Sequence, residues 1–424
     1  MKKLNYQENK VFILAAGFLA VVILLFIGIL AGGRINFHFK PHNNLASSTD
    51  NYSELDAIRG QNQDFGQLTV FFKDLANKKG GEYAYKALAF AANSNYLAPN
   101  IDTHLLGHVV GDVLFAQEGL DGIKVCTNDL RNACSHSIVV GALLTQGLGA
   151  LPKAVETCHL APGGSGAYTM CVHGLGHGVL AYTNYDMKKA IQLCDKVGQP
   201  VMSSQEYAQC TGGVTMEMMA GIHDPVAWAK QTPYYFSKTD PLSPCDMSFM
   251  PAAAQPMCYN YLTPHLFQMA GADLGNPGPK DFEKAFTFCA KLPVSNRVNW
   301  DNCYGGFGKE FPVLVNGRNV ENVQDLDDAK LKTVYSWCQL AKVSAGVTDC
   351  MNSALSSLYW GGENNRDVAI RFCNAVSDAQ NQSLCFTSLS GAVSYYIQDH
   401  SYRESYCSEI PQAYQTDCRR LLLL

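Results

Sequence analysis

Basic residues are not in excess in this sequence, which has 32 Lys+Arg against 37 Asp+Glu and a formal net charge of −5. Proteins that bind nucleic acids neutralise phosphates with lysine and arginine, so this balance argues against a nucleic-acid partner. The sequence also lacks a CxxC or CxxCH motif, a phosphate-cradling P-loop and a GxSxG nucleophile elbow. These absences argue against attached haem, P-loop nucleotide binding and α/β-hydrolase chemistry.

Cysteine, in contrast, is abundant, with 16 residues in a chain of 424. So many thiols are unusual in a cytosolic enzyme, whereas an even, high count is typical of an oxidising compartment. Hydrophobic residues make up 47% of the chain, which is enough for a large packed core rather than a disordered polymer.

The N-terminal region contains an uncharged apolar stretch at residues 11–33. About 20 apolar residues suffice to cross the hydrocarbon core of a bilayer. Lys2, Lys3 and Lys10 precede the stretch, and Glu8 alone opposes them. Because positive charge stays on the cytoplasmic side, the chain after residue 33 is expected outside the cytoplasm.

We therefore predict a cytoplasmic tail at residues 1–10, a transmembrane signal-anchor at 11–33, a flexible tether at 34–65 and an extracytoplasmic helical repeat domain at 66–424. The membrane is then a partner through residues 11–33, and the body lies in the periplasm or at the cell surface. A secretory signal cleaved after Gly33 is the alternative. Both interpretations place the body where cysteines pair.

The cysteine spacing indicates an internal repeat. Taken two at a time along the chain, the cysteines are 8 to 16 residues apart within a pair and 22 to 35 residues apart between pairs. The first cysteine of a pair usually closes a short helical pattern, as in KAIQLC (189–194), and the second opens a longer one, as in CVHGLGHGVLA (171–181). Each unit is therefore predicted to be a helical hairpin held by its own disulfide.

This pattern favours eight consecutive pairings, namely 126–134, 158–171, 194–210, 245–258, 289–303, 338–350, 373–385 and 407–418. A hairpin cannot bury its apolar face alone, so neighbouring hairpins are expected to stack. The predicted fold is all-α, a right-handed α-solenoid of about eight to nine stapled hairpins behind one N-terminal transmembrane helix. A first hairpin near residues 66–115 lacks cysteines.

The arrangement over residues 66–424 resembles disulfide-stapled tetratricopeptide-like repeat arrays, in which a cysteine also ends one helix and begins the next. The resemblance is architectural. The tetratricopeptide consensus is absent and the spacing within pairs varies, so no functional residue is carried over.

Histidines recur at fixed positions in the first repeats. His136 and His173 each lie two residues after the second cysteine of a pair, and His104 lies two residues after Asp102, which takes the cysteine position in the first hairpin. His108 lies four residues after His104, and His177 lies four residues after His173, so each pair shares one helix face.

Imidazole is the commonest metal ligand, and three imidazoles can hold a catalytic ion with one position open to water. We therefore predict a transition-metal site (zinc, copper or iron) formed by the registered histidines: His104, His108, His136, His173 and His177. One shared site and two sites bridged by His136 are both compatible with the register. Asp112, one turn after His108, and Glu217 are the residues predicted to handle protons.

The sequence predicts a membrane-anchored, extracytoplasmic metal-binding repeat protein. It does not decide whether the protein is an enzyme, nor whether such an enzyme would catalyse hydrolysis or oxidation. The alternative is a non-catalytic solenoid that holds a protein or peptide in its concave groove, with structural or pH-sensitive histidines. Gly174, Gly176 and Gly178 interleave with the histidines, and they indicate either close helix approach or an irregular helix start.

Overall fold

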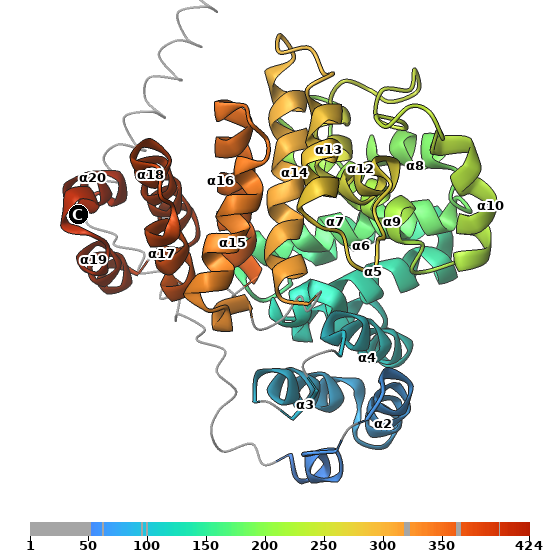
Figure 1. The fold of residues 1–424 in the computed structure, drawn as a ribbon. Coiled ribbons are helices and arrows are strands. Elements are labelled where there is room, and N and C mark those ends of the chain that lie inside the picture. The colour runs from blue at the N-terminus through green and yellow to red at the C-terminus, as the bar shows by residue number, and fades with distance from the viewer. Residues whose placement is uncertain are drawn as a thin grey trace, which may run out of the picture. The chain divides into compact units, whose positions relative to one another are not determined.

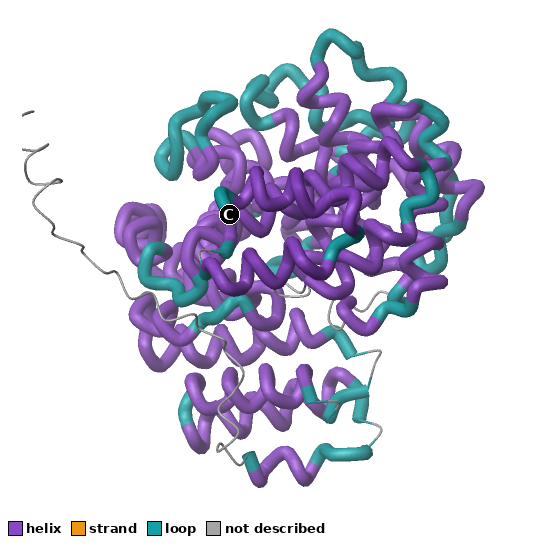
Figure 2. Tube along the Cα trace, turned by 90° about the vertical axis from the view of Figure 1, so that its left-hand side faces the viewer, coloured by secondary structure: helices purple, strands orange, loops and turns teal. Residues whose placement is uncertain are grey.

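The computed structural model describes residues 52–424 except 62, 95, 99–100, 318–322, 362–365 and 398. All regular structure in this part of the chain is helical, and it contains no strand (Figures 1 and 2). The predicted all-α class is therefore confirmed. The predicted tail, transmembrane span and first part of the tether lie outside the described residues.

The α-helices follow one another closely along the chain. They are α2 (Phe65–Lys79), α3 (Gly81–Asn93), α4 (Thr103–Glu118), α5 (Ala133–Gln146), α6 (Leu151–Cys158), α7 (Gly164–Tyr182), α8 (Met187–Cys194), α9 (Gln205–Ala220), α10 (Pro225–Tyr235), α11 (Gln255–Tyr261), α12 (Thr263–Ala270), α13 (Pro279–Cys289), α14 (Arg297–Val315), α15 (Asp328–Gln339), α16 (Ser344–Gly361), α17 (Arg366–Ala375), α18 (Ala379–Tyr396), α19 (His400–Glu409) and α20 (Gln412–Leu422). Short 3-10 helices are η1 (Ser53–Ala57), η2 (Gly119–Val125), η3 (Asp129–Asn132), η4 (Gly147–Ala150) and η5 (Val323–Asp325).

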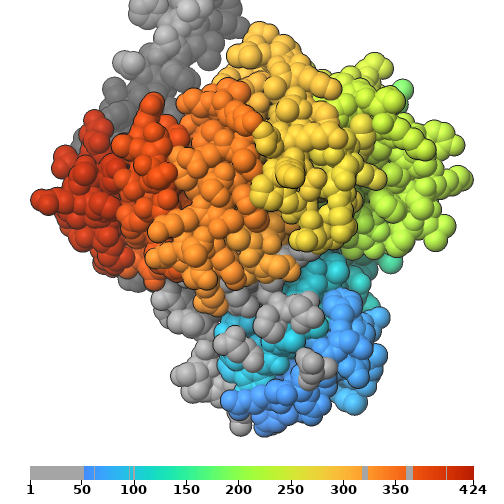
Figure 3. Space-filling model, viewed as in Figure 1, coloured from blue at the N-terminus to red at the C-terminus, as the bar shows by residue number. Residues whose placement is uncertain are grey.

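One helix of each repeat contacts the equivalent helix of the next repeat. These helices, which we call the B helices, are α4, α5, α7, α9, α11, α14, α16, α18 and α20, and each packs against its successor. Figure 1 shows α14, α16 and α18 side by side, and the surface in Figure 3 runs in the same chain order from green to red. Residues at one register position of the B helices are therefore brought together from neighbouring repeats.

All eight predicted disulfides are confirmed, and no cysteine is free. Their Cα–Cα distances run from 5.3 to 5.7 Å. Cys158, Cys194 and Cys289 are each the last residue of a short helix, and their partners lie on the B helix that follows. In these repeats the disulfide therefore fixes the hairpin, whereas Cys126 and Cys245 lie outside the α-helices, so the first and fourth bonds do not close the predicted two-helix hairpin.

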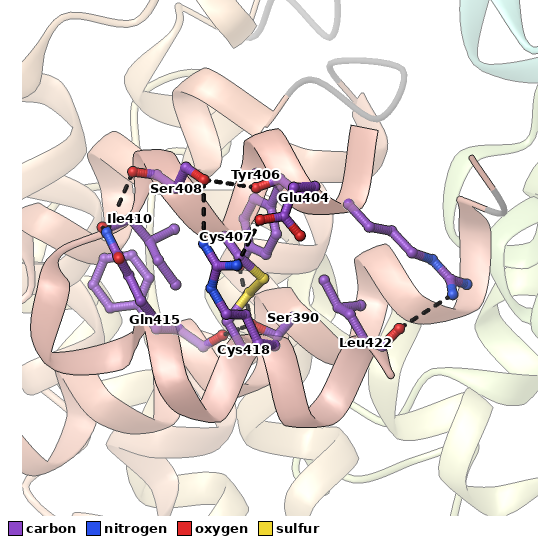
Figure 4. The surroundings of a disulfide bond; sticks show 12 residues. Ser390, Glu404, Tyr406, Cys407, Ser408, Ile410, Gln415, Cys418 and Leu422 are labelled. Carbon is purple, nitrogen blue, oxygen red and sulfur yellow. Dashed lines mark hydrogen bonds and ion pairs between the residues drawn. A yellow bond between two sulfur atoms is a disulfide. The ribbon is translucent and has the colours of Figure 1, made fainter. Parts of the chain in front are cut away.

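Figure 4 shows how the disulfide of the last repeat is packed. The Cys407–Cys418 bond joins α19 to α20. Beside it, Ser390 of α18 lies 3.1 Å from the hydroxyl of Tyr406, so the neighbouring repeat is tied to the hairpin by a buried hydrogen bond.

Aspartates begin several of the helices. Asp102, at the cysteine position of the first repeat, caps α4 by accepting a hydrogen bond from the Leu105 backbone N–H at 2.9 Å. Asp186 caps α8 in the same way. An N-cap carboxylate satisfies a backbone donor that has no partner within the helix, which fixes where the helix starts. His104 is thereby placed in the first turn of α4.

The glycines of α7 allow a very close helix contact. The helix is continuous from Gly164 to Tyr182, so these glycines do not mark an irregular start. A Cβ on Gly176 would lie 2.1 Å from the Cys210 carbonyl oxygen of α9, and one on Gly174 would lie 2.8 Å from the ring of His136 on α5. Only residues without a side chain permit this approach, and it draws the histidine-bearing helices together.

The helical body begins before residue 66. Ser53–Ala57 forms η1, and Leu55 and Ile58 are buried in the same core as the first helices. The C-terminal part of the segment predicted as a tether is thus packed against the repeats.

Among the described residues, the stretch Asp129–Cys158 is long and apolar enough to cross a membrane by length and composition alone. Its helix α5 lies between α4 and α7, and residues 133–140 are all buried. Core helices of soluble proteins meet the same criterion, so the stretch is weak evidence for a membrane anchor.

Candidate metal centre

The five histidines predicted from the register lie together at the B helices. His104 and His108 project from α4, His136 from α5, and His173 and His177 from α7. The ring centroids of His104 and His108 are 4.8 Å apart and those of His173 and His177 are 5.1 Å apart. His136 stands between the two pairs, 5.3 to 6.0 Å from all four rings.

A sixth histidine, which the register did not predict, completes the group. His223 lies in the loop after α9, with its ring 5.6 Å from that of His108 and 5.9 Å from that of His177. It thereby links the first repeat to the third and closes a ring of contacts. We call these six residues the histidine cluster: His104, His108, His136, His173, His177 and His223.

Backbone carbonyls fix the tautomers of two members. Nδ1 of His104 lies 2.8 Å from the Leu130 carbonyl oxygen, and Nε2 of His136 lies 3.0 Å from the Met170 carbonyl oxygen. A carbonyl only accepts hydrogen bonds, so each of these nitrogens carries the proton and the other ring nitrogen carries a lone pair. The lone pair on His136 Nδ1 is buried and has no hydrogen-bond partner.

His104 and His108 face each other through Nε2 atoms 3.2 Å apart. Nδ1 of His108 lies 3.0 Å from the hydroxyl of Ser137, which in turn donates to the His108 carbonyl oxygen. With His108 donating from Nδ1, both Nε2 atoms carry lone pairs. The gap is then closed either by one shared proton, after a tautomer change at His108, or by a metal ion that both nitrogens bind.

A buried carboxylate orients the other side of the cluster. Oε2 of Glu217 accepts hydrogen bonds from Nδ1 of His177 and Nδ1 of His223, both at 2.9 Å. In the neutral form of each ring this contact leaves a lone pair on Nε2, and on His177 that atom is buried with no hydrogen-bond partner to accept a proton. A carboxylate behind an imidazole fixes the ring and raises its basicity as a metal ligand.

Glu217 has no unused acceptor position. Its Oε1 accepts from the hydroxyl of Tyr185 and from the His223 backbone N–H at 3.0 Å. Burial raises the pKa of this carboxyl, but the hydrogen bonds from His177 and His223 outweigh burial and hold the pKa far below its usual value. Glu217 is therefore an ionised anchor for two imidazoles, and its predicted role in proton handling stays a prediction.

Two segments with left-handed backbone support the cluster. Leu130, Arg131 and Asn132 have φ values of 56°, 50° and 63°, and Leu130 supplies the carbonyl that holds His104. Asn184 and Tyr185 have φ values of 53° and 60°, and Tyr185 supplies the hydroxyl that reaches Glu217. Non-glycine residues rarely adopt this conformation, which costs about 1 kcal/mol or more for each residue, and it concentrates at functional sites.

Four of the six imidazoles in the cluster favour the neutral form. Burial is the main cause that lowers the pKa of His108, His136 and His173 well below the usual value, and neighbouring histidines lower it further. Burial also lowers the pKa of His104. A neutral ring is the form that binds a metal, so no proton has to leave these four residues at neutral pH.

Asp112 lies at the edge of the cluster and is exposed. Desolvation by the surrounding protein raises the pKa of its carboxyl, whereas Ser137 and His223 act in the opposite direction. Among the predicted site residues it is the acid in contact with solvent, so it is better placed than Glu217 to exchange protons with water.

The spacing of the cluster fits metal coordination. One ligand atom from each of His104, His108 and His136 lies within 4.8 Å of the others; the same holds for His177, Glu217 and His223, where the Glu217 oxygens already accept hydrogen bonds from both rings. Imidazoles that share one tetrahedral ion place their nitrogens about 3.3 Å apart and their ring centroids about 5 Å apart, given metal–nitrogen bonds of about 2.0–2.1 Å. His104 and His108 match these values, with Nε2 atoms 3.2 Å apart and ring centroids 4.8 Å apart, and the rings of His108, His136, His177 and His223 in contact with one another are 5.3–5.9 Å apart.

Two further polar residues lie outside the histidine cluster, although each is seven residues after the second cysteine of a pair, as Glu217 is. His265 of α12 packs its ring 4.8 Å from that of Phe236, and Glu310 of α14 forms an ion pair with Lys309. Sequence reasoning missed His223 and Tyr185 because both follow helices rather than share the B-helix register. The only sequence signal for His223 was its closeness to Glu217.

Comparison of the chain with protein-family models, curated proteins and solved structures found no match. The geometry itself supports a helical, disulfide-rich protein with two groups of histidine and glutamate side chains that could hold a metal ion. Its eight disulfides indicate an oxidising, extracytoplasmic compartment.

Proposed function

We propose that this protein is a membrane-anchored, extracytoplasmic metal-binding repeat protein whose transition-metal centre is the histidine cluster. The single observation that carries the proposal is the set of fixed tautomers. His104, His136, His177 and His223 each donate one N–H to a protein acceptor, which leaves a lone pair on the other nitrogen. Two of these lone pairs are buried without partners.

An unpartnered buried acceptor costs about 1–3 kcal/mol, so two in one cluster require an explanation. A metal ion supplies one, because it binds each lone pair that the protein leaves open. The hydrogen bonds behind the rings match the pattern in which carbonyl and carboxylate groups orient metal-binding histidines.

We infer that the ion lies on the Nε2 side of His177 and His223, with Glu217 behind the rings. The Nδ1 atoms of His177 and His223 both face Glu217 and donate hydrogen bonds to its carboxylate. The open nitrogens of His108 and His136 belong to the same ring of contacts. His104, His108 and His136 form a second possible position, since one ligand atom from each lies within 4.8 Å of the others.

Such a centre would activate bound water or dioxygen, with Asp112 exchanging protons with solvent and Glu217 setting the orientation of the imidazoles. Zinc would favour hydrolysis, whereas copper or iron would favour oxidation. The repeats would form a right-handed solenoid whose inner wall carries the cluster. Residues 11–33 would anchor this body to the membrane.

The test is elemental analysis of protein produced in an oxidising compartment, combined with titration by Zn²⁺ and Co²⁺ after chelator treatment. We expect stoichiometric metal in the wild type and its loss in the double variant His136→Ala/His177→Ala. His400→Ala, which changes an exposed histidine outside the cluster, should bind as the wild type does.

A wild-type protein that binds neither ion would refute the metal centre. It would favour the non-catalytic solenoid that binds a protein or peptide. Circular dichroism of each variant ensures that a loss of metal reflects the missing ligands and not an unfolded chain.

A further inference from the structure

One member of the histidine cluster has a different neighbour from the others. Nε2 of His173 on α7 lies 3.4 Å from the thioether sulfur of Met216 on α9. The two residues come from adjacent B helices, which cross closely because Gly176 and Gly213 lack side chains. The close crossing therefore holds the backbones of His173 and Met216 next to each other.

We propose that His173 and Met216 bind monovalent copper, forming a soft-metal site beside the imidazoles that hold the divalent ion. His177 is the neighbouring imidazole, with its ring 5.1 Å from that of His173. The proposal rests on the proposed metal-binding function and names one metal for one part of the cluster.

The distance fits a shared ion. An ion bound to one imidazole nitrogen at about 2.0 Å and to one sulfur at about 2.3 Å holds the two atoms about 3.3–3.6 Å apart at angles near tetrahedral. The observed separation of 3.4 Å lies in this range. Thioether sulfur is a soft ligand that suits Cu(I), whereas calcium and magnesium prefer oxygen ligands.

The surrounding charges favour an ion of low charge. Both ligands are neutral, and His173 is fully buried. Lys309, which lies over the ring of Tyr261 beside His173, forms an ion pair with Glu310, so this side of the site supplies no net negative charge for a divalent ion. The buried carboxylate of Glu217, in contrast, lies behind His177 and His223, where it balances a divalent ion.

Copper also has a route to this site. Met216 is partly exposed, whereas Glu217, the next residue on α9, is fully buried. The flexible Met216 thioether therefore lies where an incoming ion can meet it before reaching the buried imidazole.

The contact has a simpler explanation, which the experiment must separate from copper binding. His173 could donate a hydrogen bond from Nε2 to the sulfur, with no metal involved. Met216→Leu removes the sulfur and nearly conserves the volume of the side chain. Met219→Leu changes a methionine on the same helix, also partly exposed, and serves as the matched control.

Cu(I) affinity is measured anaerobically by competition with bathocuproine disulfonate, with ascorbate as a reductant that spares disulfides. We expect Met216→Leu to weaken Cu(I) binding by at least about tenfold, since even residues behind the ligands contribute that much to metal affinity. Met219→Leu should match the wild type, and X-ray absorption should show a Cu–S distance of about 2.3 Å that Met216→Leu lacks.

Unchanged Cu(I) affinity in Met216→Leu, or no Cu(I) binding by the wild type, would overturn the proposal. Titration with Co²⁺ keeps this failure distinct from that of the proposed function. If Co²⁺ binds and Met216→Leu has no effect on Cu(I), only the soft site is wrong. If the wild type binds neither ion, the metal centre itself is wrong.

Discussion

Replacing Glu217 by glutamine tests the organisation of the cluster most directly. The two carboxylate oxygens accept four hydrogen bonds, two at each oxygen. An amide presents one oxygen and one NH₂ group, so whichever way it is turned, the NH₂ group faces two donors. Glu217→Gln therefore loses at least two hydrogen bonds to a buried anion.

The size of the effect follows from those two bonds. A hydrogen bond to a charged group contributes about 1.5–3 kcal/mol, so we expect unfolding free energy to fall by about 3 kcal/mol or more. If the amide nitrogen faces His177 and His223, their tautomers are no longer fixed. We expect the affinity for Zn²⁺ or Co²⁺ to fall by about 10–100-fold, which is typical of a residue that orients metal ligands.

Two assays measure these quantities. Denaturant titration of the metal-free protein gives the midpoint shift at constant slope, and competition with a chromophoric chelator gives the metal affinity. Glu118→Gln, at an exposed position of α4, is the charge-matched control and should change neither value. Complete loss of binding would indicate that Glu217 is itself a ligand. Wild-type affinity together with a wild-type midpoint would refute the role assigned to Glu217.

The other predictions concern pH, packing and covalent structure. Because burial lowers the pKa of His108, His136 and His173, the unfolded state binds more protons below about pH 6.5. The metal-free protein should then lose stability as the pH falls from 7 to 5, by up to about 1.4 kcal/mol per pH unit for each histidine. A thermal unfolding midpoint that does not change over this pH range would contradict the prediction. Gly176→Ala places a methyl group 2.1 Å from the Cys210 carbonyl oxygen, so it should destabilise the fold by about 1–3 kcal/mol or more and weaken metal binding. Gly391→Ala adds a methyl group in open space on α18 and should stabilise the fold slightly. Equal effects of the two substitutions would refute the close approach of α7 and α9. Mass spectrometry under non-reducing conditions should show no alkylatable thiol in the described domain, and a disulfide between different repeats would show that the pairing is wrong. Replacing both Cys194 and Cys210 by serine should lower the free energy of unfolding by about 2–3 kcal/mol.

Much of the fold could be predicted because the cysteines act as a regular marker along the sequence. Alternating short and long spacings define each hairpin, and a disulfide requires its two residues to be close, so the pairing follows from the repeat. The histidine register could be predicted for the same reason: His136 and His173 sit at one distance from their cysteines. The juxtaposition of His104, His136 and His177 depends on consecutive helices packing together, which a repeat guarantees.

The remaining parts of the site depend on irregular backbone that no periodicity describes. His223 reaches His108 from a loop that follows the left-handed Gly221, and its position is set by hydrogen bonds to Glu217. Tyr185 reaches Glu217 from a left-handed turn after α7. The sequence marked Glu217 only by its register, and the number of donors around it became evident only in three dimensions.

The order of the disulfides also bears on how the chain matures. Every bond joins two cysteines that are consecutive in the sequence, so each can close as soon as its own hairpin has emerged, before the next cysteine arrives. Such a chain needs an oxidant but little reshuffling by an isomerase. A whole repeat could also be duplicated or deleted during evolution without leaving an unpaired cysteine.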